Sequence, residues 1–132
     1  MAMKLQVGVK ALIKNDQGEY LLLRRSQVME NETEAHWDIP GGRIEPEEPL
    51  EDALRREIKE ETGLEILDKP VLLGAQDIFV KKADLHVVRL TYSLQGSGDI
   101  IISDEHQEMR WVKPNEVITL NLDPYLRQVL DI

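Results

Sequence analysis

The stretch GRIEPEEPLEDALRREIKEETGL, residues 42–64, decides how the rest of this 132-residue chain is interpreted. It predicts a helix from Leu50 to Thr62, because Leu, Glu, Ala, Arg and Lys are good helix formers. Pro49 suits the first turn of this helix, where a proline loses no intrahelical hydrogen bond. Gly63 is a natural C-cap, because glycine adopts the left-handed conformation without strain. The stretch therefore predicts one helix with defined ends.

Three glutamates of this helix share one face. At 100° per residue, Glu57, Glu60 and Glu61 fall within an arc of roughly 100°, where their charges repel one another. Leu54 and Ile58 lie to one side and form the expected packing stripe. A carboxylate cluster beside an apolar stripe suits a hard cation, because Mg²⁺ prefers oxygen ligands and is typically held by carboxylates together with substrate phosphates. The helix alone leaves two interpretations open, a divalent-cation site or an acidic solvated surface.

The wider pattern resembles the Nudix box. Gly42 is followed, after five residues, by Glu48 and, after seven more, by Arg56-Glu57-Ile58-Lys59-Glu60-Glu61-Thr62-Gly63-Leu64. Every defined position of the box, Gly-x5-Glu-x7-Arg-Glu-U-x-Glu-Glu-x-Gly-U with U a bulky aliphatic, is matched. The resemblance extends to Trp37-Asp38-Ile39-Pro40-Gly41 and to the spacing between Glu105 and Trp111. Glu47, where many members have glycine, and Pro49 depart from the common pattern, but both stand at variable positions.

The resemblance implies a metal site on the predicted helix. Glu57, Glu60 and Glu61 match the family's principal metal ligands, and the carbonyl of Gly41 matches a backbone ligand that some members use. The residue at Glu57 is also read as a general base in some members. The metal implied is Mg²⁺, with Mn²⁺ as a substitute.

The resemblance also assigns supporting roles around the metal. Arg56 matches an arginine that orients the glutamates, since its planar fork can hold two carboxylate oxygens at once. Glu48 matches a carboxylate that is usually structural. Glu105 resembles a glutamate of a distal loop that binds metal or serves as base in some members. Glu108 is the alternative to Glu105, and either residue could instead be a plain surface residue.

Four further residues are candidates for substrate binding. Arg24 and Arg25 end a predicted strand and could bind phosphate, although an exposed arginine pair is as readily explained by solvation. Trp37 and Phe79 could stack on a base, although packing in the core or at its rim is the default for each.

The remaining sequence predicts one domain, residues 1–132, of the α/β class. The resemblance implies a Nudix-type α/β/α sandwich with a mixed β-sheet. A turn is expected at Asn15 to Gly18 and a loop from Ser26 to Ala35. The predicted strands run from Leu5 to Ile13, Tyr20 to Leu23, Val71 to Val80, Leu85 to Leu94 and Met109 to Val112, and a short terminal helix follows Asp123-Pro124 to about Leu130.

Charge and composition limit the classes of molecule that this chain is expected to bind. The net charge is −9, and residues 43–65 hold nine acidic and four basic residues, a field that repels a nucleic-acid backbone. The chain contains no cysteine and no long apolar run that would span a membrane. We therefore expect a cytoplasmic protein that binds a small-molecule nucleotide and neither nucleic acid nor membrane. A homodimer is left open.

The expected activity is Mg²⁺-dependent hydrolysis of a nucleoside diphosphate linkage. The first hypothesis is cleavage of a nucleoside triphosphate to monophosphate and pyrophosphate. The compact size and the Trp111-Val112-Lys113-Pro114 segment favour it, and the absence of marks typical of ADP-ribose and diadenosine-polyphosphate relatives agrees. One alternative is a nucleoside diphosphate linked to a sugar or similar group. The other is a sensor that binds nucleotides without turnover, although the intact glutamates argue against it.

Overall fold

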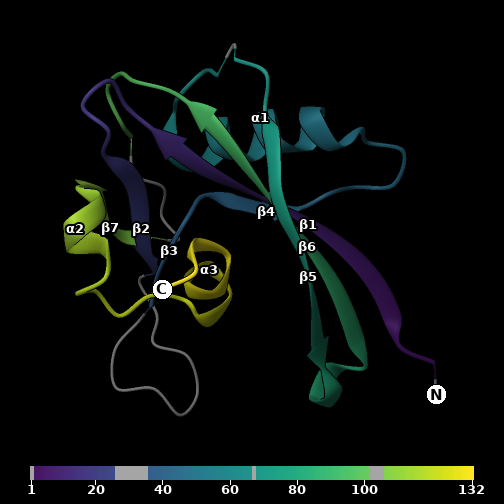
Figure 1. The fold of residues 1–132 in the computed structure, drawn as a ribbon. Helices are drawn as coiled ribbons and strands as arrows, with labels where there is room; N and C mark the ends of the chain where they lie inside the picture. The colour runs from purple at the N-terminus through teal and green to yellow at the C-terminus, as the bar shows by residue number, and fades with distance from the viewer. Residues whose placement is uncertain (1, 26–35, 67, 102–105) are drawn as a thin grey trace.

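The computed structural model describes residues 2–25, 36–66, 68–101 and 106–132, which form a β-sheet flanked by helices (Figure 1). The strands are β1 (Lys4–Lys14), β2 (Tyr20–Arg25), β3 (Trp37–Asp38), β4 (Gly41–Arg43), β5 (Val71–Val80), β6 (Leu85–Gln95) and β7 (His106–Val112). The helices are α1 (Leu50–Thr62), α2 (Pro114–Val117) and α3 (Pro124–Leu130), and the 3-10 turn η1 (Lys81–Ala83) joins β5 to β6.

The sheet is mixed and is built around β1. β1 runs parallel to β6 along its whole length, from the pair Lys4 and Leu85 to the pair Lys14 and Gln95, whereas the other pairings are antiparallel. β1 and β2 pair where Lys14 faces Tyr20 and then follow different neighbours. β1 continues beside β4 and β6, and β2 continues beside β3 and β7. The expected mixed sheet of an α/β fold is confirmed.

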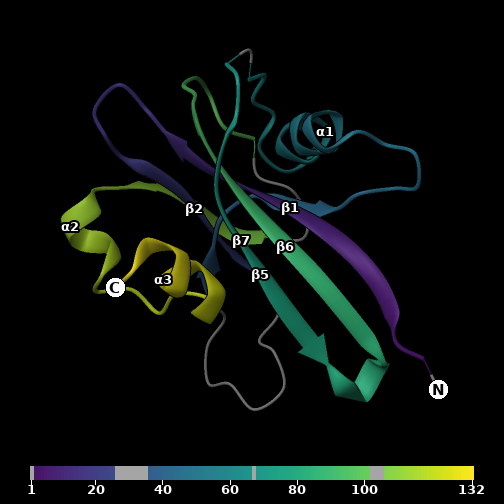
Figure 2. The same cartoon turned by 45° about the vertical axis from the view of Figure 1, so that its right-hand side comes forward.

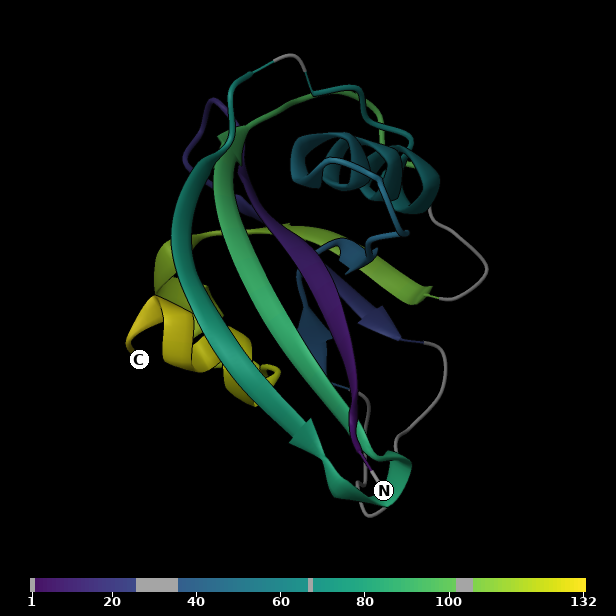
Figure 3. The ribbon, with the colours of Figure 1, turned by 90° about the vertical axis from the view of Figure 1, so that its right-hand side faces the viewer.

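Helices cover both faces of the sheet. α1 lies on one side and α2 and α3 lie on the other (Figures 2 and 3). Neighbouring strand residues point to opposite faces, so Leu21 and Leu23 pack with Leu54 and Ile58 of α1, whereas Leu22 packs with Leu126 of α3. One strand therefore supplies two separate hydrophobic cores.

The helix predicted from the box is confirmed at both ends. α1 begins after Pro49, and Gly63 ends it in the left-handed conformation with φ of 77°, donating its N–H to the Lys59 carbonyl. Leu54 and Ile58 are fully buried, as their stripe predicted. The predicted strands and the terminal helix are also present, with bounds that differ by a few residues at most.

Three short elements were not predicted. β3, β4 and α2 contain two to four residues each, too few for a period of either 2.0 or 3.6 to register in a sequence. The expected loop from Ser26 to Ala35 lies outside the described residues. Within the residues described, no helix is long and apolar enough to cross a membrane.

Candidate active site

Two glycines bring the backbone of β4 against α1. The N–H of Gly41 donates to Oε1 of Glu61 at 3.0 Å. A Cβ atom built on Gly42 would lie 2.5 Å from the Glu57 carboxyl carbon. Gly41 has φ of 151°, which disfavours side chains, and a Cβ there would overlap the Val9 carbonyl. Glycine is therefore needed at position 41 for the backbone conformation and the packing of β4 on β1, and at position 42 for the close approach of Glu57.

The Arg56 guanidinium donates hydrogen bonds to three carboxylates, two on α1 and one on the loop before it. Its Nε and Nη2 donate to the two carboxylate oxygens of Glu48 at 2.7 and 2.9 Å. Its Nη1 donates to Glu57 at 2.9 Å and, at 3.4 Å, to Glu60. Nη2 also donates to the Arg43 carbonyl at 3.2 Å. One guanidinium thus joins the loop before α1 to two of the three predicted metal ligands.

Glu48 anchors this arrangement from the loop. Besides Arg56, its carboxylate accepts the N–H of Glu45 at 3.0 Å, which closes the turn that leads into α1. The hydrogen bonds from Arg56 and from the Glu45 N–H lower the pKa of Glu48 to about 2. The same bond to Glu48 raises the pKa of Arg56 above its usual range. Both groups are therefore charged throughout the physiological pH range.

The three glutamates lie at different depths. Glu61 continues the Leu54 and Ile58 stripe and is buried. The Glu57 side chain is 15% exposed and the Glu60 side chain 59% exposed. The cluster therefore runs from the core beside Gly41 outward to solvent.

The carboxylates have the donor chemistry of a Mg²⁺ site but do not converge on one point. Among the described residues, no three Asp, Glu, His or Cys side chains are grouped so that they could hold a metal ion. Glu57 and Glu60 are turned toward Arg56, and one oxygen of Glu61 accepts the Gly41 N–H. Hard oxygen donors on consecutive turns of one helix nevertheless suit Mg²⁺, which keeps several waters and needs few protein ligands.

Of the two candidates for the distal glutamate, only Glu108 belongs to the described residues. Glu105 lies outside the described residues, so its predicted role stays a prediction. Its alternative, Glu108, lies on β7 opposite Arg24 and accepts from Nη2 of that arginine at 3.0 Å. Glu108 is therefore engaged in a cross-strand ion pair.

Of the four predicted substrate-binding residues, Arg24 and Trp37 face each other across β2 and β3, and Arg25 adjoins Arg24. Arg24 is held by Glu108, and Arg25 is exposed at the end of β2. Trp37 is buried with Leu22 and Leu126 in the core between the sheet and α3, the α3-side core. Its ring lies 5.4 Å from the Arg24 guanidinium and 5.5 Å from that of Arg110. Trp37 thus packs internally.

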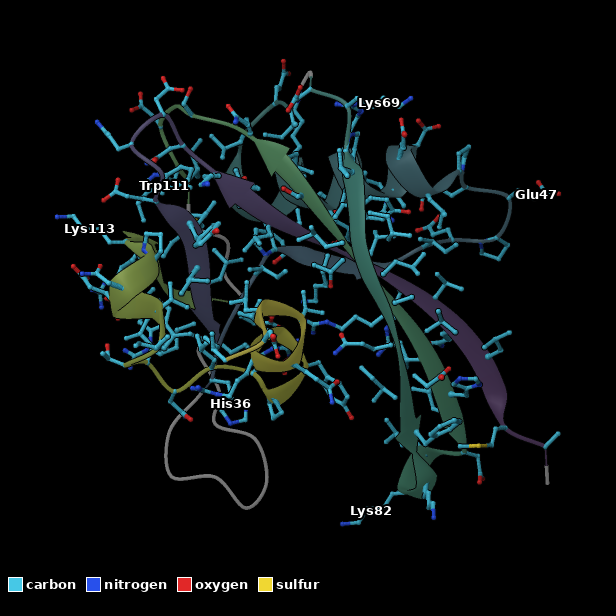
Figure 4. All side chains as sticks on the ribbon, viewed as in Figure 1. His36, Glu47, Lys69, Lys82, Trp111 and Lys113 are labelled. Atoms are coloured by element: carbon cyan, nitrogen blue, oxygen red, sulfur yellow. The ribbon has the colours of Figure 1, made fainter. Side chains whose placement is uncertain are left out.

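Phe79 lies away from the glutamates. Its ring stacks on His86 with centroids 4.5 Å apart, at the end of β5 that leads into η1. Lys82 marks that end in Figure 4, and Glu47 marks the loop before α1 at a distant part of the molecule. The structure therefore does not bring Phe79 to the carboxylate cluster.

A buried ion cluster was missed from the sequence. It consists of Lys10, Asp38, Arg89 and Asp123, from β1, β3, β6 and the residue before α3. Arg89, only 5% exposed, donates to both oxygens of Asp38 at 2.9 and 3.3 Å and lies 3.4 Å from Asp123. Lys10 lies 3.3 Å from Asp38. The signal in the sequence was Arg89, a charged residue between Val88 and Leu90 in the middle of a predicted strand.

The pKa values of the two aspartates in the ion cluster shift in opposite directions. Burial alone would raise the pKa of Asp38, but the charges of Lys10 and Arg89 outweigh it and lower the pKa to about 2. Burial and the neighbouring Asp38 raise the pKa of Asp123. Asp123 also caps α3, accepting the N–H groups of Tyr125 and Leu126.

The fold and the glutamate-bearing helix define a known class of enzyme. Residues 4–131 match the NUDIX domain, and the chain belongs to this family of Nudix hydrolases. It is 33% identical to the "Nucleoside triphosphatase NudI" of Salmonella agona over 97% of this chain and 96% of that protein. The Escherichia coli protein of the same name is 31% identical over the same shares.

Solved structures agree with this assignment. The MutT protein from Methanosarcina mazei superposes with a TM-score of 0.84 at 29% identity, covering 99% of this chain and 94% of that one. The Escherichia coli ORF135 protein superposes with a TM-score of 0.80 at 27% identity, covering 98% and 88%. The expected family and fold are confirmed.

Proposed function

We propose that this chain hydrolyses nucleoside triphosphates to nucleoside monophosphate and pyrophosphate, in a reaction that depends on Mg²⁺. The similarity to proteins named nucleoside triphosphatase, along nearly the full length of both chains, supports the substrate class. The observation that carries the proposal is the arrangement around Arg56, which holds Glu57 and Glu60 beside Glu61 at the glycine pair.

Glu57, Glu60, Glu61 and the Gly41 carbonyl would hold the metal. When bound, Mg²⁺ offsets the charge of the diphosphate and polarises phosphorus toward attack. Mn²⁺, which also accepts carboxylate and carbonyl ligands, would substitute. The close approach of Gly42 supports a defined position for the Glu57 carboxylate, because its backbone leaves that carboxylate little room to move inward.

The chain's own groups position the reaction. Glu57 is partly exposed and suits the role of a base that accepts a proton from the attacking water. Glu105 is the alternative base. Arg56 orients Glu57 and Glu60 through the hydrogen bonds that its Nη1 donates to them.

The four candidate substrate-binding residues differ in how accessible their side chains are. Arg25 is exposed and suits a phosphate, whereas Arg24 is shared with Glu108 and Trp37. Trp37 would have to leave the core to stack on a base. Phe79 would serve a base only if the substrate extended to the η1 end of β5.

A turnover screen tests the proposal. Purified protein with Mg²⁺ is given nucleoside triphosphates, ADP-ribose and nucleotide sugars, and the products are separated by chromatography. Monophosphate with pyrophosphate is expected, and Glu57→Gln should lower the rate of their formation at least about a hundredfold. Nucleoside diphosphate with orthophosphate would contradict the proposal. Cleavage of ADP-ribose or a nucleotide sugar alone would point to the second substrate class, and binding without turnover would point to a sensor.

A further inference from the structure

We propose that Arg89 is a positioning residue of the active site, acting through Asp38 on the peptide that carries Gly41 and Gly42. This inference rests on the proposed function for its kinetic consequence. Its structural basis is the buried ion cluster, which lies on the face of the sheet opposite α1. The side chains of Lys10 and Arg89 point to that face, since their strand neighbours Ala11 and Leu90 pack on the α1 side.

A short chain of contacts joins Asp38 to the glycine pair. Oδ1 of Asp38 accepts the N–H of Ile39 at 2.8 Å, and Nζ of Lys10 donates to the Ile39 carbonyl at 3.2 Å. The next carbonyl, that of Pro40, accepts the N–H of Ala11 at 2.8 Å. The ion cluster therefore holds both backbone groups of Ile39, two residues before Gly41, whose N–H contacts Glu61.

The connecting peptide is stiff. Pro40 has its φ locked by the ring, and Ile39 is restricted to extended conformations because it precedes a proline. The Ile39 side chain is also buried in the α3-side core. A change in the orientation of Asp38 is therefore passed to Gly41 rather than absorbed by bond rotation between them.

Stability alone is a weak reason for such a cluster. Replacing a buried ion pair with well-packed apolar side chains is often neutral or stabilising, because desolvation offsets much of the attraction between the charges. The arginine instead fixes the orientation of Asp38, because its planar guanidinium donates to both carboxylate oxygens. Asp38 in turn directs one of these oxygens to the Ile39 N–H.

The test compares three variants of the full chain. Arg89→Met removes both the charge and the guanidinium that binds the two oxygens of Asp38. Arg89→Lys keeps the charge but cannot bind both oxygens in the same plane. Arg127→Met is the control. Arg127 donates to the Leu120 carbonyl and belongs to α3, outside the ion cluster. Kinetic constants are measured with ATP, GTP, CTP and UTP, and thermal unfolding gives the folded fraction of each variant.

A positioning role predicts loss of kcat rather than of binding. A displacement on the order of 1 Å at a reacting group can lower the rate about a hundredfold. We therefore expect Arg89→Met to lower kcat at least about tenfold, by a similar factor for every triphosphate cleaved, with KM little changed. Arg89→Lys should fall between wild type and Arg89→Met. A loss confined to KM, or to one base, would overturn the proposal, because it would make Arg89 a substrate contact.

Amide NMR supplies a readout that does not depend on turnover. Arg89→Met should shift the amide resonances of Gly41 and Gly42 and speed hydrogen exchange at Gly41, while Gly18 in the β1–β2 turn stays unchanged. Arg127→Met should leave all three glycines unchanged. Unaltered Gly41 and Gly42 resonances in Arg89→Met would overturn the positioning role. Shifted resonances in a protein that cleaves no triphosphate would support it while contradicting the proposed function.

Discussion

The guanidinium of Arg56 binds the carboxylate of Glu48 through two hydrogen bonds, with Nε and Nη2 donating to its two oxygens at 2.7 and 2.9 Å. The two residues are eight positions apart, one on the loop before α1 and one in its middle. This pair fixes the side chain that reaches Glu57 and Glu60, so the geometry of the candidate metal ligands begins at a residue that is not itself one of them.

The Glu48 pair should make stability depend on pH. The pKa of Glu48 falls from 4.5 to about 2 in the folded protein, so its contribution is present above pH 4.5 and is lost as the pH falls toward 2. Glu48→Gln should therefore lower the free energy of unfolding at pH 7, and this difference from wild type should shrink between pH 4.5 and 2. Denaturant unfolding of both proteins across this range measures it. A difference that stays constant would contradict the pairing.

Gly42→Ala should impair the site more than the fold. The added Cβ would lie 2.5 Å from the Glu57 carboxyl carbon, and that flexible side chain can move aside. We expect turnover to fall at least about tenfold, the scale of a displaced catalytic group, with a small change in melting temperature. Gly74→Ala is the matched control, because among the described residues the nearest contact of its Cβ would be Val129 at an ordinary 3.8 Å. Equal activities of the two variants would count against the Glu57 placement.

Glu57→Gln and Glu60→Gln should each lower turnover at least about a hundredfold, the scale for a base or a metal-site carboxylate. The fold should survive, because each change relieves repulsion on the acidic face of α1. Turnover is measured at increasing Mg²⁺ and compared with Glu65→Gln, whose exposed side chain pairs with Lys59 away from the cluster. Near-normal rates in both site variants would refute the assignment.

Glu105 should matter more for turnover than Glu108. The Glu108 carboxylate is paired with Arg24 across the β2–β7 ladder, which gives it a structural task. We expect Glu105→Gln to lower kcat strongly and Glu108→Gln to act mainly on stability. Rates at saturating Mg²⁺ and melting temperatures of both variants separate these effects. If Glu108→Gln instead has the strongly lowered kcat, the assignment of Glu105 as the functional glutamate is wrong.

Much of the site could be predicted because it is local in sequence. The helical period alone placed Glu57, Glu60 and Glu61 on one face and Leu54 and Ile58 beside them. The box spacing added the loop partner Glu48, which lies only eight residues from Arg56. Within one helix and its adjoining loop, backbone geometry leaves few alternatives.

Tertiary structure decided the contacts between distant segments. Whether Trp37 packs inside or faces a substrate depends on Arg24, Arg110 and the α3-side core, and the separation of Phe79 from the glutamates depends on strand order.

The same holds for the ion cluster of Lys10, Asp38, Arg89 and Asp123, whose members come from four separate segments. The sequence by itself determined the family, the box helix and the face that its glutamates share, because these follow from local spacing. Sheet pairing and the packing of α3 alone determined which charges are buried together, because no local period relates residues so far apart in the chain.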